Sequence, residues 1–172
     1  GSQKFIVRKP KEKRDNGSII ENAIEMLDSK DCLSRLPIIS QHGSNQEERL
    51  FNAALDLSIT WINRILFLKL LESQIIKYHN GNKKNQFLSS DKITDYDILD
   101  GLFFRILARK EDERKDSYLK ERFQHVPYLN SSLFEQTDLE HATISISSLD
   151  NNARIKPYSK SVLNIKGTEA KN

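Results

Sequence analysis

The chain has 172 residues, of which 30% are charged and 37% are hydrophobic, with six glycines, four prolines and one cysteine. This length suits one globular domain, and the composition excludes collagen-like, disulfide-stapled and membrane-spanning chains. The single cysteine and the absence of an apolar leader near the N-terminus predict a cytoplasmic location.

The net charge of +3 is unevenly distributed along the chain. Residues 1–14 hold six basic residues and one acidic residue, and residues 153–172 hold five basic residues and one acidic residue. The stretch between them is therefore acidic overall. Because a nucleic-acid surface usually gathers lysine and arginine on one folded face, we interpret both basic ends as solvated segments.

These composition shifts predict the domain organisation. Gly1-Ser2 is typical of an expression-tag remnant, and residues 1–17 are expected to be this remnant followed by a flexible basic leader. Residues 18–150 are expected to form one helical domain. Residues 151–172 are expected to be a basic tail that leads to an absent following domain, so we interpret the chain as a fragment of a longer protein.

The first helix is expected to begin at Ser18. Ser18 and Glu21 have the spacing of a capping box, in which the hydroxyl accepts the N3 amide and the carboxylate reaches back to the cap amide. Apolar residues then recur at helical spacing. A second helical turn is expected from Cys32 to Leu36, ended by Pro37, and we interpret Cys32 as a structural thiol.

The apolar pattern over residues 46–79 predicts one long central helix. Ser44 and Glu47 repeat the capping-box spacing, and the apolar residues that follow form two adjacent stripes, which indicates burial on more than one side. Asn80-Gly81 supplies a stop. At about 1.5 Å per residue the helix would be roughly 50 Å long, and polar residues interrupt its apolar run too often for a membrane span.

The asparagine- and lysine-rich loop after this helix offers two candidate contacts to a DNA backbone, Lys83 and Lys84. A further helix is predicted over residues 96–109, with Thr94 or Asp95 at its start.

A short helix is expected to end before Pro127. Further along, Ile144 and Ile146 alternate with polar residues, which predicts a strand that could pair with the chain near Ile155 or over residues 162–165. The predicted fold is therefore mainly α, a helical domain around one long central helix, with a small β element near the C-terminal end.

Few residues could carry chemistry. The four histidines lie far apart, and no glycine-rich phosphate loop is present. Asp100, Glu113 and Lys115 follow the D…E-x-K order of some metal-dependent nucleases, but such sites need adjacent strands and a solvated helix face explains the spacing better. Asp95, Asp97 and Asp100 could bind Mg²⁺, yet acids near a helix N-terminus explain them too. We therefore assign no catalytic, metal or cofactor residue.

Two segments carry a resemblance to a known family. The run R-I-L-F-L-K-L-L-E at Arg64–Glu72 resembles a helix of the bifunctional type IIG restriction-modification proteins, which there precedes an adenine-specific DNA methyltransferase domain. The run V-P-Y-L-N-S-S-L-F-E at Val126–Glu135 resembles that family's P-Y-L-N-G-G-L-F-E turn, and L-F-F-R-I-L-A at residues 102–108 precedes it as in the family. The run I-S-I-S-S-L at Ile144–Leu149 is also similar.

The second segment is interpreted as a structural turn. Ser131 and Ser132 replace the two glycines of the family pattern, so the turn must be reshaped or Asn130 must take over the positive φ. A proline can end the preceding helix, an asparagine can satisfy turn amides, and aromatic residues can pin the turn to a neighbouring surface. The residues in these roles are Pro127, Asn130, Tyr128 and Phe134.

The resemblance implies a function for the parent protein. Such a parent transfers a methyl group from S-adenosylmethionine to N6 of adenine in a recognised DNA sequence, with or without Mg²⁺-dependent DNA cleavage. The cofactor-binding glycine motif and the N-P-P-[YF] motif are absent from this sequence, so they are expected beyond Asn172, and a nuclease domain is expected before Gln3. The expected partners are DNA and the neighbouring nuclease and methyltransferase domains of the same chain.

Three hypotheses remain open on the sequence. The first is a noncatalytic helical connector of a restriction-modification protein. The second is a stand-alone helical adaptor for protein interactions, suggested by the double-striped helix and the acidic middle of the chain. The third is a small metal-dependent nuclease, which depends on the spacing of Asp100, Glu113 and Lys115 alone.

Overall fold

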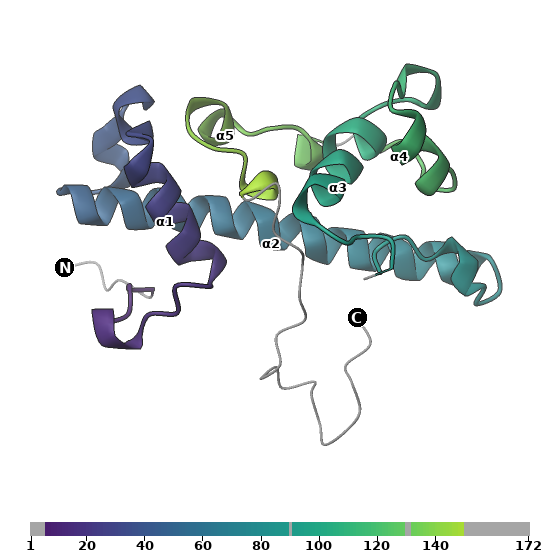
Figure 1. The fold of residues 1–172 in the computed structure, drawn as a ribbon, viewed down its shortest axis with the longest axis horizontal. Coiled ribbons are helices and arrows are strands. Elements are labelled where there is room, and N and C mark those ends of the chain that lie inside the picture. Colours follow the sequence, from purple (N-terminus) through teal and green to yellow (C-terminus); the bar gives the residue numbers. More distant parts are fainter. Residues whose placement is uncertain (1–5, 90, 130–131, 150–172) are drawn as a thin grey trace. The chain divides into compact units, whose positions relative to one another are not determined.

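The computed structural model describes residues 6–89, 91–129 and 132–149 (Figure 1). This described part is mainly α-helical, as the sequence predicts, with five α-helices and no β-strand. It falls into two compact units. The first unit comprises the described residues up to Asn63 together with Gln136–Leu149, and the second comprises those within Arg64–Glu135.

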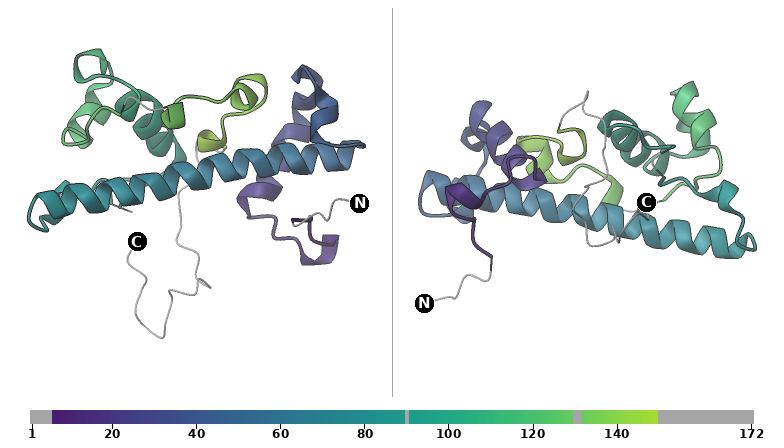
Figure 2. Two further views of the ribbon diagram at one scale, coloured as in Figure 1. Left: turned by 180° about the vertical axis from the view of Figure 1, so that it is seen from behind. Right: turned by 60° about the horizontal axis from the view of Figure 1, so that its bottom comes forward.

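The longest element is helix α2, Gln46–Tyr78, whose 33 residues confirm the predicted long helix and contribute to both units. Figure 2 shows it uninterrupted from two further sides. Its cap lies one residue later than predicted, because the side-chain oxygen of Asn45 accepts the amide of Glu48 at 2.9 Å. The predicted stop at Asn80-Gly81 is confirmed: both residues have positive φ, and the Gly81 amide donates to the carbonyl of Ile76 at 2.9 Å.

The first unit adds two α-helices to its part of α2. Helix α1 (Ile19–Ser29) begins at the predicted cap, where the hydroxyl of Ser18 accepts the Glu21 amide at 3.4 Å. Helix α5 (Asp138–Ala142) was not predicted and begins with a complete capping box between Thr137 and Glu140. The single turns of this unit are η1 (Lys11–Lys13), η2 (Cys32–Arg35), η3 (Ile39–His42) and η8 (Ile146–Ser148).

The core of the first unit is an apolar cluster between α1, α2 and the segment after α5. Cys32 has no exposed surface and belongs to this cluster, which agrees with a structural thiol. Its other fully buried members, with no exposed surface, are Ala23, Leu27, Ala53, Ala54, Leu57 and Ile146. The helical turn predicted at Cys32 is present as η2, and burial of Cys32 and Leu33 in the core stabilises it.

The basic N-terminal segment makes ion pairs within this unit. The guanidinium of Arg8 forms a two-bonded pair with the carboxylate of Glu21, with N–O distances of 2.6 and 3.1 Å. Arg8 and Arg14 also lie 3.6 and 3.5 Å from the carboxylate of Glu47. The Glu21 carboxylate therefore accepts from the Arg8 guanidinium and not from the Ser18 amide, as the predicted capping box would require.

The strand predicted around Ile144 and Ile146 is wrong. Ile144 and Ser145 have no regular structure, and Ile146 begins the turn η8. Both isoleucines are buried in the core. The Ile146 amide donates to the Glu140 carboxylate at 3.2 Å and is therefore not free to bond a neighbouring strand. Alternating apolar residues fit this short core-lining segment as well as a strand. The suggested pairing segments, near Ile155 and over 162–165, lie outside the described residues.

The second unit adds two α-helices to its part of α2. Helix α3 (Tyr96–Gly101) begins at Asp95, whose side chain accepts the Ile98 amide at 2.9 Å, as predicted. Helix α4 (Ser117–Arg122) is capped by Asp116 and ends before Pro127, as predicted. The single turns are η4 (Lys83–Asn85), η6 (Glu111–Glu113) and η7 (Ser132–Phe134).

The helix predicted over 96–109 changes type halfway along its length. From Leu102 to Leu107 it is a π-helix, η5, in which the Ala108 amide donates to the carbonyl of Phe103, five residues back, at 3.1 Å.

The described helices include none with the length and apolar character needed to cross a membrane.

Candidate functional site

The second unit is organised around one buried charge, Arg64, which lies on α2 and has no exposed surface. Its Nε donates to the carbonyl of Leu133 at 2.8 Å, and its Nη2 donates to the carbonyl of Glu135 at 2.7 Å. The planar guanidinium can donate in two directions at once, which suits two carbonyls of one turn. Arg64 therefore fixes the 133–135 turn to α2.

Aromatic rings enclose the same guanidinium. Its central carbon lies 5.1 Å from the centroid of the Phe104 ring and 5.8 Å from that of Phe103, which are cation–π distances. The Phe134 ring stacks on Phe103 at 5.9 Å and meets Phe67 edge-on at 5.7 Å. We call Arg64, these four phenylalanines and the two carbonyls the Arg64 cluster.

Glu72 is a second buried charge on α2, with 4% of its surface exposed. Its carboxylate accepts the backbone amides of Phe87 and Leu88, and it lies 3.1 Å from the ammonium of Lys69. Lys69 also donates to the carbonyl of Leu88 at 2.8 Å. Together the two side chains bind the 87–88 segment, which leaves neither of its amides unpaired.

The predicted turn residues have different surroundings. Phe134 is fully buried in the Arg64 cluster, where its ring stacks on that of Phe103. Tyr128 is 38% exposed, and Pro127 is exposed. The backbone is held nearby instead, because the Leu129 amide donates to the carbonyl of Leu107 at 2.9 Å. Asn130 lies outside the described residues.

A third buried charge of this unit, the cation Arg114, holds the chain just before this turn. Its guanidinium donates to the carbonyl of Val126 at 3.0 Å and to that of Arg109 at 3.3 Å. Burial lowers the pKa of Arg114 below its ordinary value, and the nearby Glu111 carboxylate opposes that shift. Arg114 was read from the sequence only as the middle residue of an E-x-K run.

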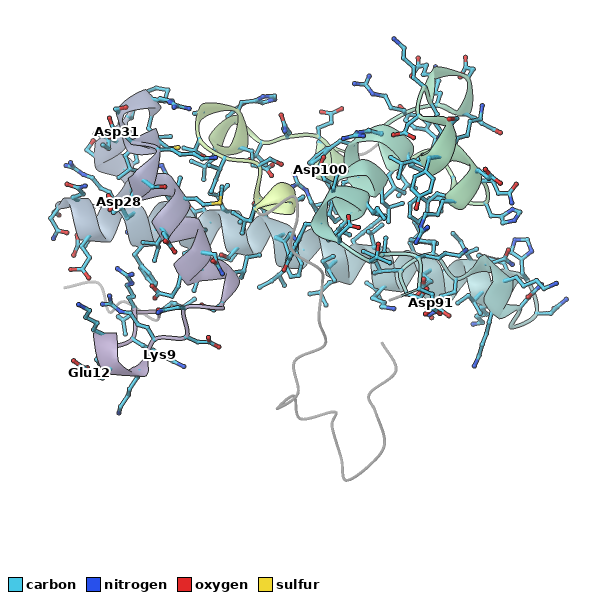
Figure 3. The ribbon with its side chains drawn as sticks, in the orientation of Figure 1. Lys9, Glu12, Asp28, Asp31, Asp91 and Asp100 are labelled. Carbon is cyan, nitrogen blue, oxygen red and sulfur yellow. The ribbon has the colours of Figure 1, made fainter. Side chains whose placement is uncertain are left out.

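The other candidates from the sequence do not gather into one site. Lys83 and Lys84 lie exposed on η4. Asp100 lies on α3 (Figure 3), whereas Glu113 and Lys115 line a hollow whose lining residues do not include Asp100. In the described ranges, no three histidine, cysteine, aspartate or glutamate side chains are grouped to hold a metal ion.

The acids proposed as a Mg²⁺ cluster have other partners. Asp95 caps α3, and Asp97 lies 3.8 Å from the guanidinium of Arg105. Negative charge at the start of a helix is favoured by the helix dipole, so Asp95 and Asp97 stabilise the N-terminus of α3.

Sequence reasoning missed the two most buried charges of α2. Arg64 and Glu72 were read as polar interruptions of an apolar helix. A usable signal was present, because charged residues within a helix that is apolar on two faces have little chance of reaching solvent. Such residues must find polar partners inside the fold.

One protein family, described as a domain of unknown function (DUF7814), matches residues 1–172 of the chain. No curated protein matches the chain, and no solved structure matches it. A function therefore has to be inferred from the residues of the chain itself.

Proposed function

We propose that this chain, which belongs to the DUF7814 family over residues 1–172, is a noncatalytic helical connector of a DNA restriction-modification protein similar to the type IIG enzymes. The parent would methylate N6 of adenine with S-adenosylmethionine, with or without Mg²⁺-dependent cleavage. The partners would be DNA and the neighbouring domains of the same protein. The connector would set the position of those domains, and the reactive groups would lie elsewhere.

One observation carries the proposal: three of the four runs that resemble the family meet in the Arg64 cluster. Arg64 opens the first resembling segment, Phe103 and Phe104 come from the L-F-F-R-I-L-A run, and Leu133–Glu135 closes the second segment. Chance matches at such separations would have no reason to converge. A shared packing unit explains why these particular residue types occur together.

The chemistry of the cluster suits a connector. A buried guanidinium bonded to two backbone carbonyls holds a turn in one position, and packed aromatic rings resist its displacement. Helix α2 supplies a continuous rod of roughly 50 Å at about 1.5 Å per residue. A rod with a firmly attached turn can transmit a fixed orientation to whatever is joined to it.

The first test is to read the gene beyond codon 172. We expect a glycine-bearing cofactor motif followed by N-P-P-[YF], and the full-length protein should transfer labelled methyl groups from S-adenosylmethionine to adenine in duplex DNA. A longer reading frame that holds no methyltransferase motif, or a full-length protein that methylates no DNA, would contradict the proposal.

The second test asks whether the chain positions the active domains. In the full-length protein, Arg64→Met should lower the methylation rate at least fivefold while S-adenosylmethionine binding stays within twofold. Arg35→Met is the matched control, since Arg35 is exposed, and should leave both unchanged. Equal losses in binding and methylation would indicate general misfolding rather than a positioning role.

A second candidate function, an adaptor for protein interactions, is favoured by one feature of α2. In the second unit, Leu66 and Leu70 form an apolar stripe one turn apart on this helix and are 58% and 67% exposed. An adaptor would cover this stripe with an apolar helix of another protein. A photo-crosslinker at Leu66 should then capture one defined protein from the native cell, and a crosslinker at Lys77 should not. Capture of a domain of the same polypeptide would favour the connector.

A further inference from the structure

The second unit contains a hollow of about 710 Å³ that borders the Arg64 cluster and shares Phe104 with it. A volume between about 300 and 1,000 Å³ is typical of sites for small molecules. The residues that line the hollow come from η5 and the residue two positions after it, from the end of η6, and from the chain between η6 and α4. They are Phe104, Arg105, Arg109, Glu113, Lys115 and Asp116.

The π-helical turn η5 shapes one wall of this hollow. Phe104 and Arg109 are five residues apart and would point in different directions on an α-helix, which has 3.6 residues per turn. The hydrogen bond from Ala108 to Phe103 spans five residues, so the chain leaves η5 on a wider turn, and Phe104 within η5 and Arg109 just after it both line the hollow. Single π turns within α-helices are rare and often occur at functional sites.

The charges of the hollow are partly paired within the fold. Arg105 lies 3.3 Å from the carboxylate of Asp116 and 3.8 Å from that of Asp97. Asp116 also accepts the Leu119 amide at 3.0 Å as the cap of α4. Arg105 and Asp116 are therefore engaged mainly with other residues of the fold and are poorly placed to bind a ligand.

Two other cations of the hollow remain for a ligand. The side chains of Arg109 and Lys115 are exposed and make no ion pair or hydrogen bond within the described part of the chain. Glu113 is the one lining carboxylate that no ion pair of the described residues engages. The hollow thus offers two unpaired positive charges, one negative charge and one aromatic ring.

We propose that this hollow binds a nucleotide, with one phosphate between Arg109 and Lys115 and the base against Phe104. A phosphate group accepts hydrogen bonds from guanidinium and ammonium groups, and any base can stack on an aromatic ring. The Glu113 carboxylate can accept from a ribose hydroxyl or a base amine, and its charge disfavours a triphosphate. The ligand is a free nucleoside monophosphate or one nucleotide of a single strand, which share this chemistry.

The test uses the full 172-residue chain at low salt. Fluorescence anisotropy measures binding of a labelled single-stranded oligonucleotide, and unlabelled adenosine monophosphate and inorganic phosphate serve as competitors. The double variant Arg109→Ala and Lys115→Ala should weaken binding at least tenfold. The matched control, Lys83→Ala with Lys84→Ala, removes the same charge from exposed η4 and should weaken binding less than twofold.

Two further variants separate phosphate from base. Phe104→Leu should weaken the oligonucleotide and adenosine monophosphate while leaving competition by inorganic phosphate unchanged. Glu113→Gln should tighten binding about twofold, because it removes a negative charge near the phosphate. Competition by adenosine monophosphate at micromolar concentration would identify a free nucleotide as the ligand, and competition by oligonucleotides alone would identify a strand.

Three outcomes would overturn the proposal. The first is no binding of either nucleotide probe at millimolar concentration. The second is an equal loss in both double variants, which would mean diffuse charge attraction. The third is weaker binding of the anionic oligonucleotide in Glu113→Gln, which would mean that no phosphate lies near Glu113. Circular dichroism and urea unfolding of each variant establish that the fold is intact. None of these measurements uses methyltransferase activity, so their outcome is independent of the connector proposal.

Discussion

A guanidinium buried inside a protein loses its hydration, and Arg64 recovers part of that loss through backbone carbonyls and aromatic rings. Two backbone carbonyls accept from it at 2.8 and 2.7 Å, and two aromatic rings lie within cation–π distance. A hydrogen bond to a charged donor contributes about 1.5–3 kcal/mol, and a carbonyl left unpaired inside the protein costs about 1–3 kcal/mol. The single side chain therefore has a large effect on the second unit.

Replacing Arg64 with methionine should lower the free energy of unfolding by about 2–4 kcal/mol, because the carbonyls of Leu133 and Glu135 lose their donors. Arg64→Lys should be nearly as harmful, since one ammonium cannot reproduce the planar fork. Urea unfolding measures both, with exposed Arg35→Met expected within about 0.5 kcal/mol of the original. A loss below about 1 kcal/mol for Arg64→Met would show that the cluster does not hold the turn.

At the scale of the helices, periodicity and capping chemistry predicted most of the fold. The side chains of Ser18 and Asp95 accept backbone amides at the starts of α1 and α3, and the Asn80-Gly81 pair ends α2. The π turn η5 could not be predicted, because its wider ladder depends on packing against distant residues and leaves no short-range signal. The strand at Ile144 was wrong for a related reason: core burial and the Glu140 carboxylate, both set by tertiary structure, decide the local backbone.

The candidate site was less predictable than the helices. Phe134 could be assigned a pinning role from its place in the turn, whereas the partners of Arg64 lie 69 and 71 positions away in the sequence. The hollow depends on side chains from residues 104–109 and 113–116, which only the folded chain brings together. Spacing in the sequence finds neighbours along one helix and misses such long-range partners.

Helices α3 and α4 approach each other closely at Gly101. A Cβ built at this residue would lie 2.5 Å from a methyl carbon of Leu119, which is buried, so the absence of a side chain at Gly101 makes room for Leu119. Leu119→Ala alone should cost about 2–5 kcal/mol through the cavity it leaves. In the Gly101→Ala background the same change should cost at least about 1 kcal/mol less, since the added methyl fills part of the space.

This double-mutant cycle is measured by thermal and urea unfolding of the four proteins. Alanine is also a better helix former than glycine, which adds a favourable term of up to about 1 kcal/mol that is common to both Gly101→Ala proteins and cancels in the cycle. Additive effects of the two substitutions would show that Gly101 and Leu119 are not in contact.

At the scale of the whole chain, charge is arranged so that the basic N-terminal segment meets acidic residues of the first unit. Arg8 pairs with Glu21 on α1, and Arg8 and Arg14 approach Glu47 in the first turn of α2. The side chains of Arg8 and Glu21 are only 18% and 12% exposed, so this pair is shielded from salt far better than an ordinary surface pair. The sequence interpretation of a solvated basic leader did not foresee these partners.

These contacts predict how stability depends on pH. The hydrogen-bonded guanidinium of Arg8 holds the pKa of Glu21 below its ordinary value of 4.5, against the opposing effect of burial. A carboxylate with a lowered pKa in the folded state adds stability above its pKa in the unfolded chain, and that stability is lost as the pH falls through the folded pKa. The loss therefore lies below about pH 4.5.

Glu21→Gln should accordingly lower the free energy of unfolding by about 1 kcal/mol between pH 5 and 7, and the difference from the original protein should shrink as the pH falls below about 4.5. Urea unfolding across pH 3–7 measures it, with Glu25→Gln as the matched control because Glu25 is exposed on the same helix. Arg8→Met should reproduce the Glu21→Gln profile, and the double variant should add little further loss, since each change breaks the same pair. A difference that stayed constant down to pH 3 would mean that the Glu21 carboxylate is not the group whose charge joins the N-terminal segment to α1.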